Sequence, residues 1–239
     1  MTKIPSNELS NFLKEIEADK IGIARLEDWK DTPLYEKSKE LLPEGKSIVV
    51  LAMEVFSELV KYLTSQAKVG EIQLRNLAKY NMELVNGKLN WEAYKIVKEL
   101  HKHNFKGVLL PAGSDPFDGR FLGGVISYKH AGQAAGLGVL GWHSMLLTPE
   151  YGARVRLATI ISNAPLKPTT ILNVKDTPCS KCGGICIKIC PVKAIKKPKG
   201  DETYNIDKYT CNAYCSASGG CAECLKVCPA DNMTWKSAS

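Results

Sequence analysis

All nine cysteines of this 239-residue chain lie in its last quarter, at or after Cys179. Four of them stand in the segment CSKCGGICIKICP, residues 179–191, and five in CNAYCSASGGCAECLKVCP, residues 211–229. In a reducing compartment, cysteines at such short spacing are more typical of metal ligands than of disulfides. The C-terminal part of the chain is therefore predicted to fold around bound metal.

Each cysteine run ends in a Cys-Pro pair, at Cys190 and at Cys228. Two such runs are the signature of a protein with two 4Fe-4S clusters, in which the last cysteine of each run ligates the other run's cluster. The predicted ligands of the first cluster are Cys179, Cys182, Cys186 and Cys228. Those of the second cluster are Cys190, Cys221, Cys224 and either Cys211 or Cys215. The spacing does not choose between the last two, and one cysteine is left over.

Structural zinc is the alternative, because paired CxxC motifs also form tetrahedral zinc sites. The two Cys-Pro endings and the count of eight ligands plus one favour iron and sulfur. The first run has one residue more than the usual bacterial spacing, between Cys182 and Cys186, and Gly183 and Gly184 are predicted to absorb it as a bulge. The spare cysteine is predicted to be a small packed apolar side chain.

The composition suits one fair-sized domain and a smaller one, since a chain of 239 residues that is 44% hydrophobic can bury a substantial core. The N-terminal residues lack the apolar core of a secretory signal, and the longest apolar run, Ser47–Phe56, is too short to span a bilayer. A cytoplasmic protein without membrane association is expected. The net charge of +7 favours an acidic partner, either nucleic acid or an electron-donor protein. Basic residues are concentrated locally only in IKKPKG at 195–200, and such a run is typical of a solvated loop.

Helical and strand patterns alternate over the front of the chain, which predicts a mixed α/β domain over residues 1–165 and a cysteine-rich domain over residues 166–239. The predicted helices carry Leu9, Phe12, Leu13 and Ile16; Trp91, Tyr94, Val97 and Leu100 on one face; and an Ala-rich segment ended by Gly136 and Gly138. The predicted strands cover residues 20–26, 47–55, 106–112, 145–148 and 155–162. The Gly-, Asp- and Pro-rich segment 114–124 is predicted to be a long loop at the edge of a site.

Both cysteine runs, preceded by AGLGVLGWHSMLLTPEYGARVRLATIISNAPL at 135–166, resemble the cobalamin-dependent iron-sulfur reductases, the family of epoxyqueuosine reductases and reductive dehalogenases. The segments ADKIGIARLEDW at 18–29 and LLPEGKSIVVLAMEV at 41–55 are similar to the front of that family. The family places a cysteine upstream of the second run, and CNAY at 211–214 fits this position. The resemblance thus implies Cys211 as the eighth ligand and Cys215 as the spare.

The resemblance implies an α+β protein, in which a nitroreductase-like domain that holds a base-off cobalamin is followed by a bacterial two-cluster ferredoxin-like domain. Electrons from a low-potential donor of the ferredoxin or flavodoxin type would pass through the clusters to cobalt and reduce a small organic substrate. Two rival functions remain open. One is an electron-transfer protein or reductive activator of another corrinoid protein, without its own cobalamin; the other is epoxyqueuosine reduction on tRNA.

The chain departs from the family at two places that bear on the substrate. The family's GKN after the AGLG stretch is here GWHS, at 141–144. The epoxyqueuosine reductases have an acidic proton donor before the AGLG stretch, and the corresponding position in this sequence is near Leu122. Asp118 takes its place only if the loop is shifted.

Tyr128 and Lys129 are the predicted catalytic pair, because a nearby cation lowers the pKa of a phenol that donates a proton. The alternative is a packed Tyr128 beside a solvated Lys129. The predicted cofactor-binding residues are His130, Gly136, Gly138, Gly141, Trp142, His143, Ser144, Tyr151, Gly152, Arg154 and Arg156. The glycines would let the backbone approach a macrocycle, or would only shape turns. The two arginines would bind the phosphate or propionamide groups at the edge of the cofactor, or would form an exposed strand face. Tyr151 and Gly152 are included because they match a family YG pair.

Overall fold

The computed structural model describes residues 6–63, 72–113, 117–172 and 177–233, and it has two compact units that alternate along the chain. The first unit comprises Met1–Met53, Val85–Leu137 and Arg156–Ile171. The second comprises Glu54–Leu84, Gly138–Val155 and Leu172–Ser239. Every cysteine falls in the second unit, but this unit also takes in two segments from the front of the chain. The predicted division at residue 165 therefore does not coincide with the borders of the compact units.

A four-stranded sheet is the centre of the α+β fold, with strand order β1-β2-β8-β3. The strands are β1 (Lys20–Arg25), β2 (Ser47–Glu54), β8 (Val155–Ser162) and β3 (Gly107–Leu110). β1 runs antiparallel to β2, and β3 runs antiparallel to β8. All four strands were predicted from runs of β-branched and aliphatic residues, and the structure confirms them.

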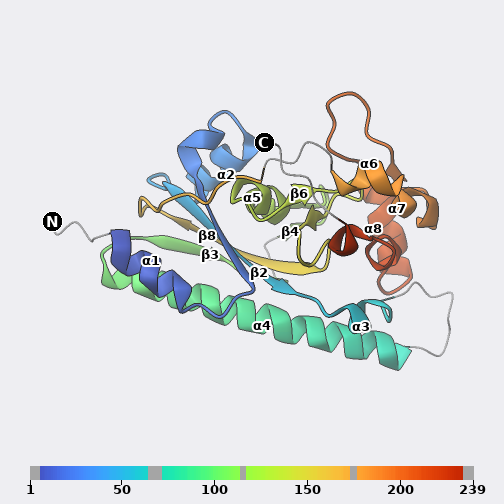
Figure 1. The fold of residues 1–239 in the computed structure, drawn as a ribbon, viewed down its shortest axis with the longest axis horizontal. Helices are drawn as coiled ribbons and strands as arrows, with labels where there is room; N and C mark the ends of the chain where they lie inside the picture. The colour runs from blue at the N-terminus through green and yellow to red at the C-terminus, as the bar shows by residue number, and fades with distance from the viewer. Residues whose placement is uncertain (1–5, 64–71, 114–116, 173–176, 234–239) are drawn as a thin grey trace. The chain divides into compact units, whose positions relative to one another are not determined.

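The helix α4 (Ile72–Lys102) covers one face of this sheet with its C-terminal half (Figure 1). Leu89 and Ile96 are fully buried there, in one cluster with Leu51 of β2 and Ile160 of β8. The sequence predicted a helix here with Trp91, Tyr94, Val97 and Leu100 on one face, and of these four Leu100 is fully buried.

Trp91 is 60% exposed and Tyr94 is 45% exposed, and the two rings stack on each other with their centroids 5.5 Å apart. The fully buried apolar positions in the C-terminal half of α4 are Leu89, Ala93, Ile96 and Leu100. Apolar residues occur on two sides of α4, so periodicity alone does not show which side faces the core. Among the described helices, α4 included, none combines the length and hydrophobicity needed to cross a membrane.

The other elements are short. They are α1 (Ser6–Lys14), η1 (Leu26–Trp29), α2 (Pro33–Leu41), α3 (Ser57–Val60), β4 (Phe117–Asp118), β5 (Gly123–Gly124), α5 (Tyr128–Ala134), β6 (Val139–Leu140), β7 (Leu146–Leu147), α6 (Pro178–Cys182), α7 (Ile185–Ile189), β9 (Ile195–Lys196), β10 (Asn205–Ile206), α8 (Lys208–Ala217), α9 (Glu223–Lys226) and η2 (Ala230–Asn232). The predicted loop 114–124 contains the small β4–β5 pair, and its residues 114–116 lie outside the described ranges.

The Ala-rich helix α5 packs against β1, as its small side chains predict. Ala131 and Ala135 are fully buried, and a Cβ on Gly22 of β1 would lie 2.3 Å from the Ala135 carbonyl oxygen. The helix ends where predicted, because Gly136 has a φ of +75°, which non-glycine residues rarely adopt. The end of α5 therefore lies so close to β1 that a side chain at Gly22 would clash with it.

Candidate metal centre

Four thiols of the second unit lie together: those of Cys179 and Cys182 on α6, Cys186 on α7 and Cys228 after α9. Burial, with smaller contributions from the charges of the other three cysteines, raises the pKa of Cys228 to about 12. Such mutual effects require neighbouring sulfur atoms, because charge interactions weaken with distance. This is the set of four that the sequence assigns to the first cluster.

The second set gathers around Cys224, whose pKa is raised to about 12 by burial and also by Cys221, Cys211 and Cys190. The pKa of Cys211 is raised by burial and then by Cys215, Cys190 and Cys221. Cys211 is thus a neighbour of all three other members of the predicted set. Cys215 lies four residues away on the same face of α8 and, with burial, also raises the pKa of Cys221, so Cys211 as the eighth ligand stays a prediction from the resemblance.

The two cysteine groups adjoin each other, since Cys186 of the first group also raises the pKa of Cys224. Their helices, α7 and α9, pack together. Backbone N–H groups point at the sulfur atoms: Trp142 N donates to Cys179 Sγ over 3.4 Å, and Ala194 N donates to Cys190 Sγ over 3.3 Å. Such bonds stabilise thiolates and, in iron-sulfur proteins, help to set the reduction potential.

Among the described residues, no three His, Cys, Asp or Glu side chains are grouped as ligands of a single ion would be. Zn–S bonds of about 2.3 Å would bring the four sulfur atoms of a zinc site within about 3.8 Å of one another. The choice of iron and sulfur over zinc therefore stays the prediction made from the two Cys-Pro endings.

Two glycines form the predicted bulge in the first run. Gly183 has a φ of +67° and Gly184 a φ of +70°, and they separate α6 from α7. A Cβ on Gly184 would lie 2.8 Å from Cζ3 of the Trp142 ring, whereas one on Gly183 would meet nothing within 4 Å. The tryptophan that donates to Cys179 is thus held against the bulge.

Replacing Gly184 with alanine is expected to destabilise the protein more than replacing Gly183. Both variants force a non-glycine residue to a positive φ, which costs about 1–2 kcal/mol. Gly184→Ala also pushes against the Trp142 ring, and overpacking adds about 1–3 kcal/mol. Urea unfolding of the anaerobically prepared protein measures the difference. Equal losses in the two variants would show that the ring contact contributes nothing.

A tight turn holds the predicted residues Gly141, His143 and Ser144. The His143 side chain is buried, its Nδ1 accepts from Met145 N over 3.2 Å, and its ring lies where a Cβ on Gly141 would stand. Ser144 has a φ of +68° and its N–H donates to the Gly141 carbonyl over 2.8 Å. These contacts give the turn its shape, and the cofactor role of the three residues stays a prediction.

The remaining predicted glycines are required by the packing of the chain itself. A Cβ on Gly138 would lie 1.9 Å from the Leu147 carbonyl oxygen, and one on Gly136 would lie 2.4 Å from the Thr170 carbonyl oxygen. Gly152, with a φ of +54°, similarly lies against the backbone of η2. These positions leave no open space beside them, so the glycines do not form a cradle for a macrocycle.

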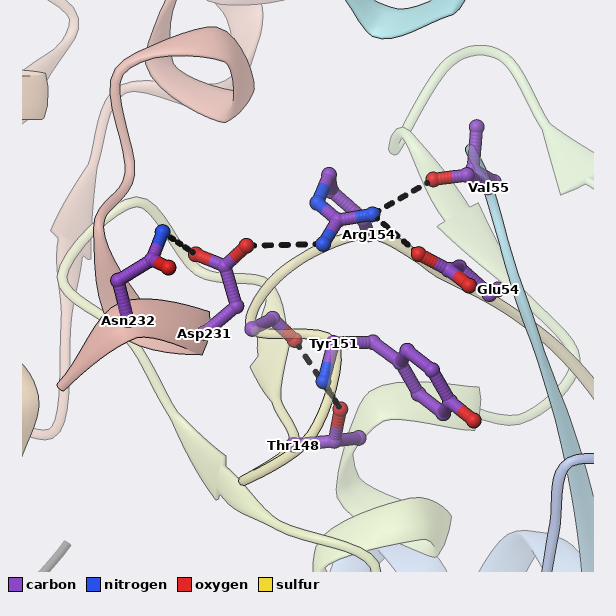
Figure 2. Close-up of polar contacts among 8 residues, drawn as sticks. Glu54, Val55, Thr148, Tyr151, Arg154, Asp231 and Asn232 are labelled. Carbon is purple, nitrogen blue, oxygen red and sulfur yellow. Dashed lines mark hydrogen bonds and ion pairs between the residues drawn. The ribbon is translucent and has the colours of Figure 1, made fainter. Parts of the chain in front are cut away.

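Arg154 joins three segments of the second unit (Figure 2). Its Nη1 donates to Glu54 over 2.6 Å and to the Val55 carbonyl over 3.1 Å, and its Nη2 donates to Asp231 over 2.8 Å. Its side chain is only 14% exposed, and two carboxylates already balance its charge. Nearby, Tyr151 N donates to the Thr148 hydroxyl over 3.2 Å.

Arg156 was predicted to act beside Arg154, but the two side chains have different partners. Arg156 belongs to the first unit, where its Nε donates to Asn86 Oδ1 over 2.8 Å. The alternative prediction, that the two arginines form an exposed strand face, does not hold at Arg154. Its side chain is 14% exposed, less than its partners Glu54 at 27% and Asp231 at 19%. Binding of a cofactor periphery by these arginines stays a prediction.

The predicted catalytic pair lies in the first turn of α5. The Tyr128 hydroxyl donates to the Pro111 carbonyl over 3.1 Å. Burial lowers the pKa of Lys129 to about 8. Burial and the Lys129 charge lower the pKa of His130, whose Nδ1 lies 2.6 Å from the Ser127 hydroxyl. Lys129 is itself a group that can release a proton near neutral pH, which the sequence did not indicate.

Sequence reasoning missed two cations that hold the second cysteine run. Arg75 Nη1 donates to the Ser218 carbonyl over 2.8 Å, and Lys79 Nζ donates to the Gly219 carbonyl over 2.7 Å. Both come from α4 and fix the loop just before Cys221. More than 100 residues separate each donor from its acceptor, and no sequence motif links them.

Comparison with known proteins fits this arrangement. The epoxyqueuosine reductase of Bacillus subtilis is 25% identical over 214 residues, which cover 80% of this chain and 51% of the relative. A tetrachloroethene reductive dehalogenase of Desulfitobacterium hafniense is 27% identical over 230 residues, covering 86% of this chain and 36% of the relative. The sequence of this chain is therefore similar to those of epoxyqueuosine reductases and reductive dehalogenases. No protein-family model matches it.

Solved structures of the epoxyqueuosine reductase and reductive dehalogenase family share the fold. An epoxyqueuosine reductase bound to a tRNA stem loop has a TM-score of 0.58 at 21% identity, covering 96% of this chain and 66% of that one. A reductive dehalogenase described as catalysing B12-dependent dehalogenation has a TM-score of 0.66 at 18% identity, covering 95% of this chain and 31% of that one. The chain spans about half, or less, of the length of the curated relatives it matches.

Proposed function

We propose that this chain is an oxidoreductase that carries two 4Fe-4S clusters and passes electrons through them to an acceptor in its α/β part. The observation that supports the proposal is that the cysteines gather into two adjoining groups, with Cys228 beside the first run and Cys190 beside Cys224 of the second. The domain types proposed are nitroreductase-like for the α/β part and ferredoxin-like for the cysteine-rich part. The relatives, all reductases by name, support this role.

The surroundings of the cysteines suit clusters of low reduction potential. The reduction potential of a cluster depends on its burial and on the hydrogen bonds to its sulfur atoms, and both are present here at Cys179. A base-off cobalamin is the acceptor that the B12-dependent relative suggests. Bound cobalamin would supply a strongly reducing cobalt centre. Since the predicted glycines form no cradle for it, the proposal assigns it no contacts and no step.

Metal analysis tests the proposal directly. Anaerobically purified protein is expected to contain about eight iron atoms per chain, and dithionite should produce a paramagnetic signal. Zinc in place of iron would contradict the proposal. Reconstitution with cobalamin then separates the reductase from the rival electron carrier: about one corrinoid per chain supports a reductase, and eight irons without corrinoid uptake support the carrier.

Reduction of epoxyqueuosine in tRNA is the second candidate, favoured by the relative that covers 80% of this chain. In this reaction Asp118 is a poor proton donor, because hydrogen bonds from Arg120 hold the pKa of its carboxyl below the ordinary value. Asp118→Asn is therefore expected to change turnover of an epoxyqueuosine-containing stem loop less than twofold. A loss of tenfold or more would assign the proton-donor role to Asp118.

Lys129 is the proposed acid of the α/β part, and its pKa of about 8 sets the expected pH dependence. The ammonium form, which donates a proton, predominates below pH 8 and is lost above it. Turnover should therefore fall about tenfold per pH unit above pH 8. Lys129→Met should lower the rate and remove this limb of the profile. Tetrachloroethene and the modified stem loop are the first substrates to assay. An unchanged profile in the variant would exclude Lys129.

A further inference from the structure

Exposed lysines surround the first cysteine run. Between Cys179 and Cys211 the chain has seven lysines and only three acidic residues. All seven lysines are exposed: Lys181, Lys188, Lys193, Lys196, Lys197, Lys199 and Lys208. The carboxylates of two of the acids serve local structure, since Asp207 caps α8 and Glu202 accepts from the Lys199 backbone. The surface of this part of the second unit is therefore strongly positive.

This positive surface lies within a few contacts of the thiols. Lys197 Nζ is 6.0 Å from the centre of the Trp142 ring, and Trp142 N donates to Cys179 Sγ. Lys188 lies on α7, between the ligand candidates Cys186 and Cys190, and α7 packs against β9, which carries Lys196. An electron that arrives at this surface has a short distance to travel to either group.

Two exposed apolar side chains lie among these lysines. Ile185 is 40% exposed and Ile189 is 41% exposed, and they are four residues apart on α7, on either side of Lys188. Complexes between electron-transfer proteins are small and weak, and complementary charge steers the partners together. An apolar centre with a charged rim is the composition of such a contact surface.

We propose that α7, β9 and their lysines form the docking surface for an acidic one-electron carrier protein. The inference rests on the proposed function and names its partner. In each encounter the reduced carrier loses one electron and a cluster of this chain gains one, and no proton or further reactant is needed. RNA is the less suitable occupant, because the chain has no arginine from Leu157 onward, and arginine is the residue that recognises phosphate and base edges bidentately.

The test uses the cluster-loaded chain and a reduced bacterial two-cluster ferredoxin, with reduction of the chain's clusters followed by stopped-flow absorbance. The double variant Lys188→Glu/Lys197→Glu reverses two charges on the proposed surface. The control Lys30→Glu/Lys98→Glu makes the same change in net charge at two exposed lysines of the first unit. The first is expected to slow reduction at least tenfold at low salt and the control less than twofold, with the difference shrinking as salt is added.

Dithionite separates failure of this inference from failure of the proposed function. It should reduce the clusters of all three proteins at the same rate, because it needs no docking surface. Equal ferredoxin rates in the two double variants, with dithionite reduction intact, would overturn the docking surface alone. Competition of a tRNA stem loop with ferredoxin, relieved by Lys188→Glu/Lys197→Glu, would assign the surface to RNA instead. A protein without iron would overturn both proposals.

Discussion

Cys228→Ala is expected to halve the iron content, from about eight to about four atoms per chain, because it removes the thiol that completes the first cysteine group. The same change at Cys224 should halve it by removing the second cluster. The double variant Cys224→Ala/Cys228→Ala, confined to one run, should then hold almost no iron. The double variant Cys179→Ala/Cys228→Ala, drawn from both runs, should still hold about four atoms. Iron analysis and the spectrum of the dithionite-reduced protein measure these outcomes.

The comparison of the two double variants tests the crossing of ligands between the runs. If each run bound its own cluster, Cys224→Ala/Cys228→Ala would keep about four irons and Cys179→Ala/Cys228→Ala would lose nearly all. Cys215→Ala is the matched control, since Cys215 lies beside the second group but is not assigned to it. It should keep both clusters, whereas Cys211→Ala should lose one. The reverse result would make Cys215 the eighth ligand.

The cysteine groups were predictable because ligand spacing within a run is a local property of the sequence. Only the choice between Cys211 and Cys215 was open from spacing, since residues four apart on a helix share a face. The bulge at Gly183 and Gly184 was predictable for a similar reason, because an extra residue in a short run requires a backbone that glycine adopts without strain.

The surroundings of the predicted cofactor residues were not predictable in the same way. Gly138 suggested an approach to a ligand, but the atom nearest to it is a carbonyl oxygen of the neighbouring strand β7. A glycine that admits a ligand and a glycine that admits another strand have the same appearance in a sequence. Likewise, the partners of Arg154 lie 100 and 77 residues away, so nothing near it in the sequence indicates that its charge is already balanced.

Arg154→Met is expected to lower the free energy of unfolding by about 2–4 kcal/mol. The change keeps the length of the side chain but leaves Glu54 and Asp231, which are 27% and 19% exposed, as two carboxylates without their shared cation. Removal of one partner from a buried ion pair costs about 3–5 kcal/mol, and partial exposure reduces this here. Asp231 follows Cys228 by three residues, so the first cluster should also be lost faster when the protein is exposed to a chelator. Anaerobic urea unfolding and the rate of iron release measure both effects.

Arg120→Met is the matched control, because it breaks an arginine–aspartate pair whose arginine is 81% exposed. Exposed pairs contribute little, so a change below about 0.5 kcal/mol is expected. The triple variant Glu54→Gln/Arg154→Met/Asp231→Asn should recover part of the lost stability, because the uncompensated charges are removed with the cation. The opposite pattern, in which Arg154→Met leaves stability and iron unchanged but abolishes corrinoid uptake, would show that Arg154 serves a cofactor. A guanidinium that two carboxylates already hold on both of its terminal nitrogens is better placed to fix η2 beside the first cysteine group.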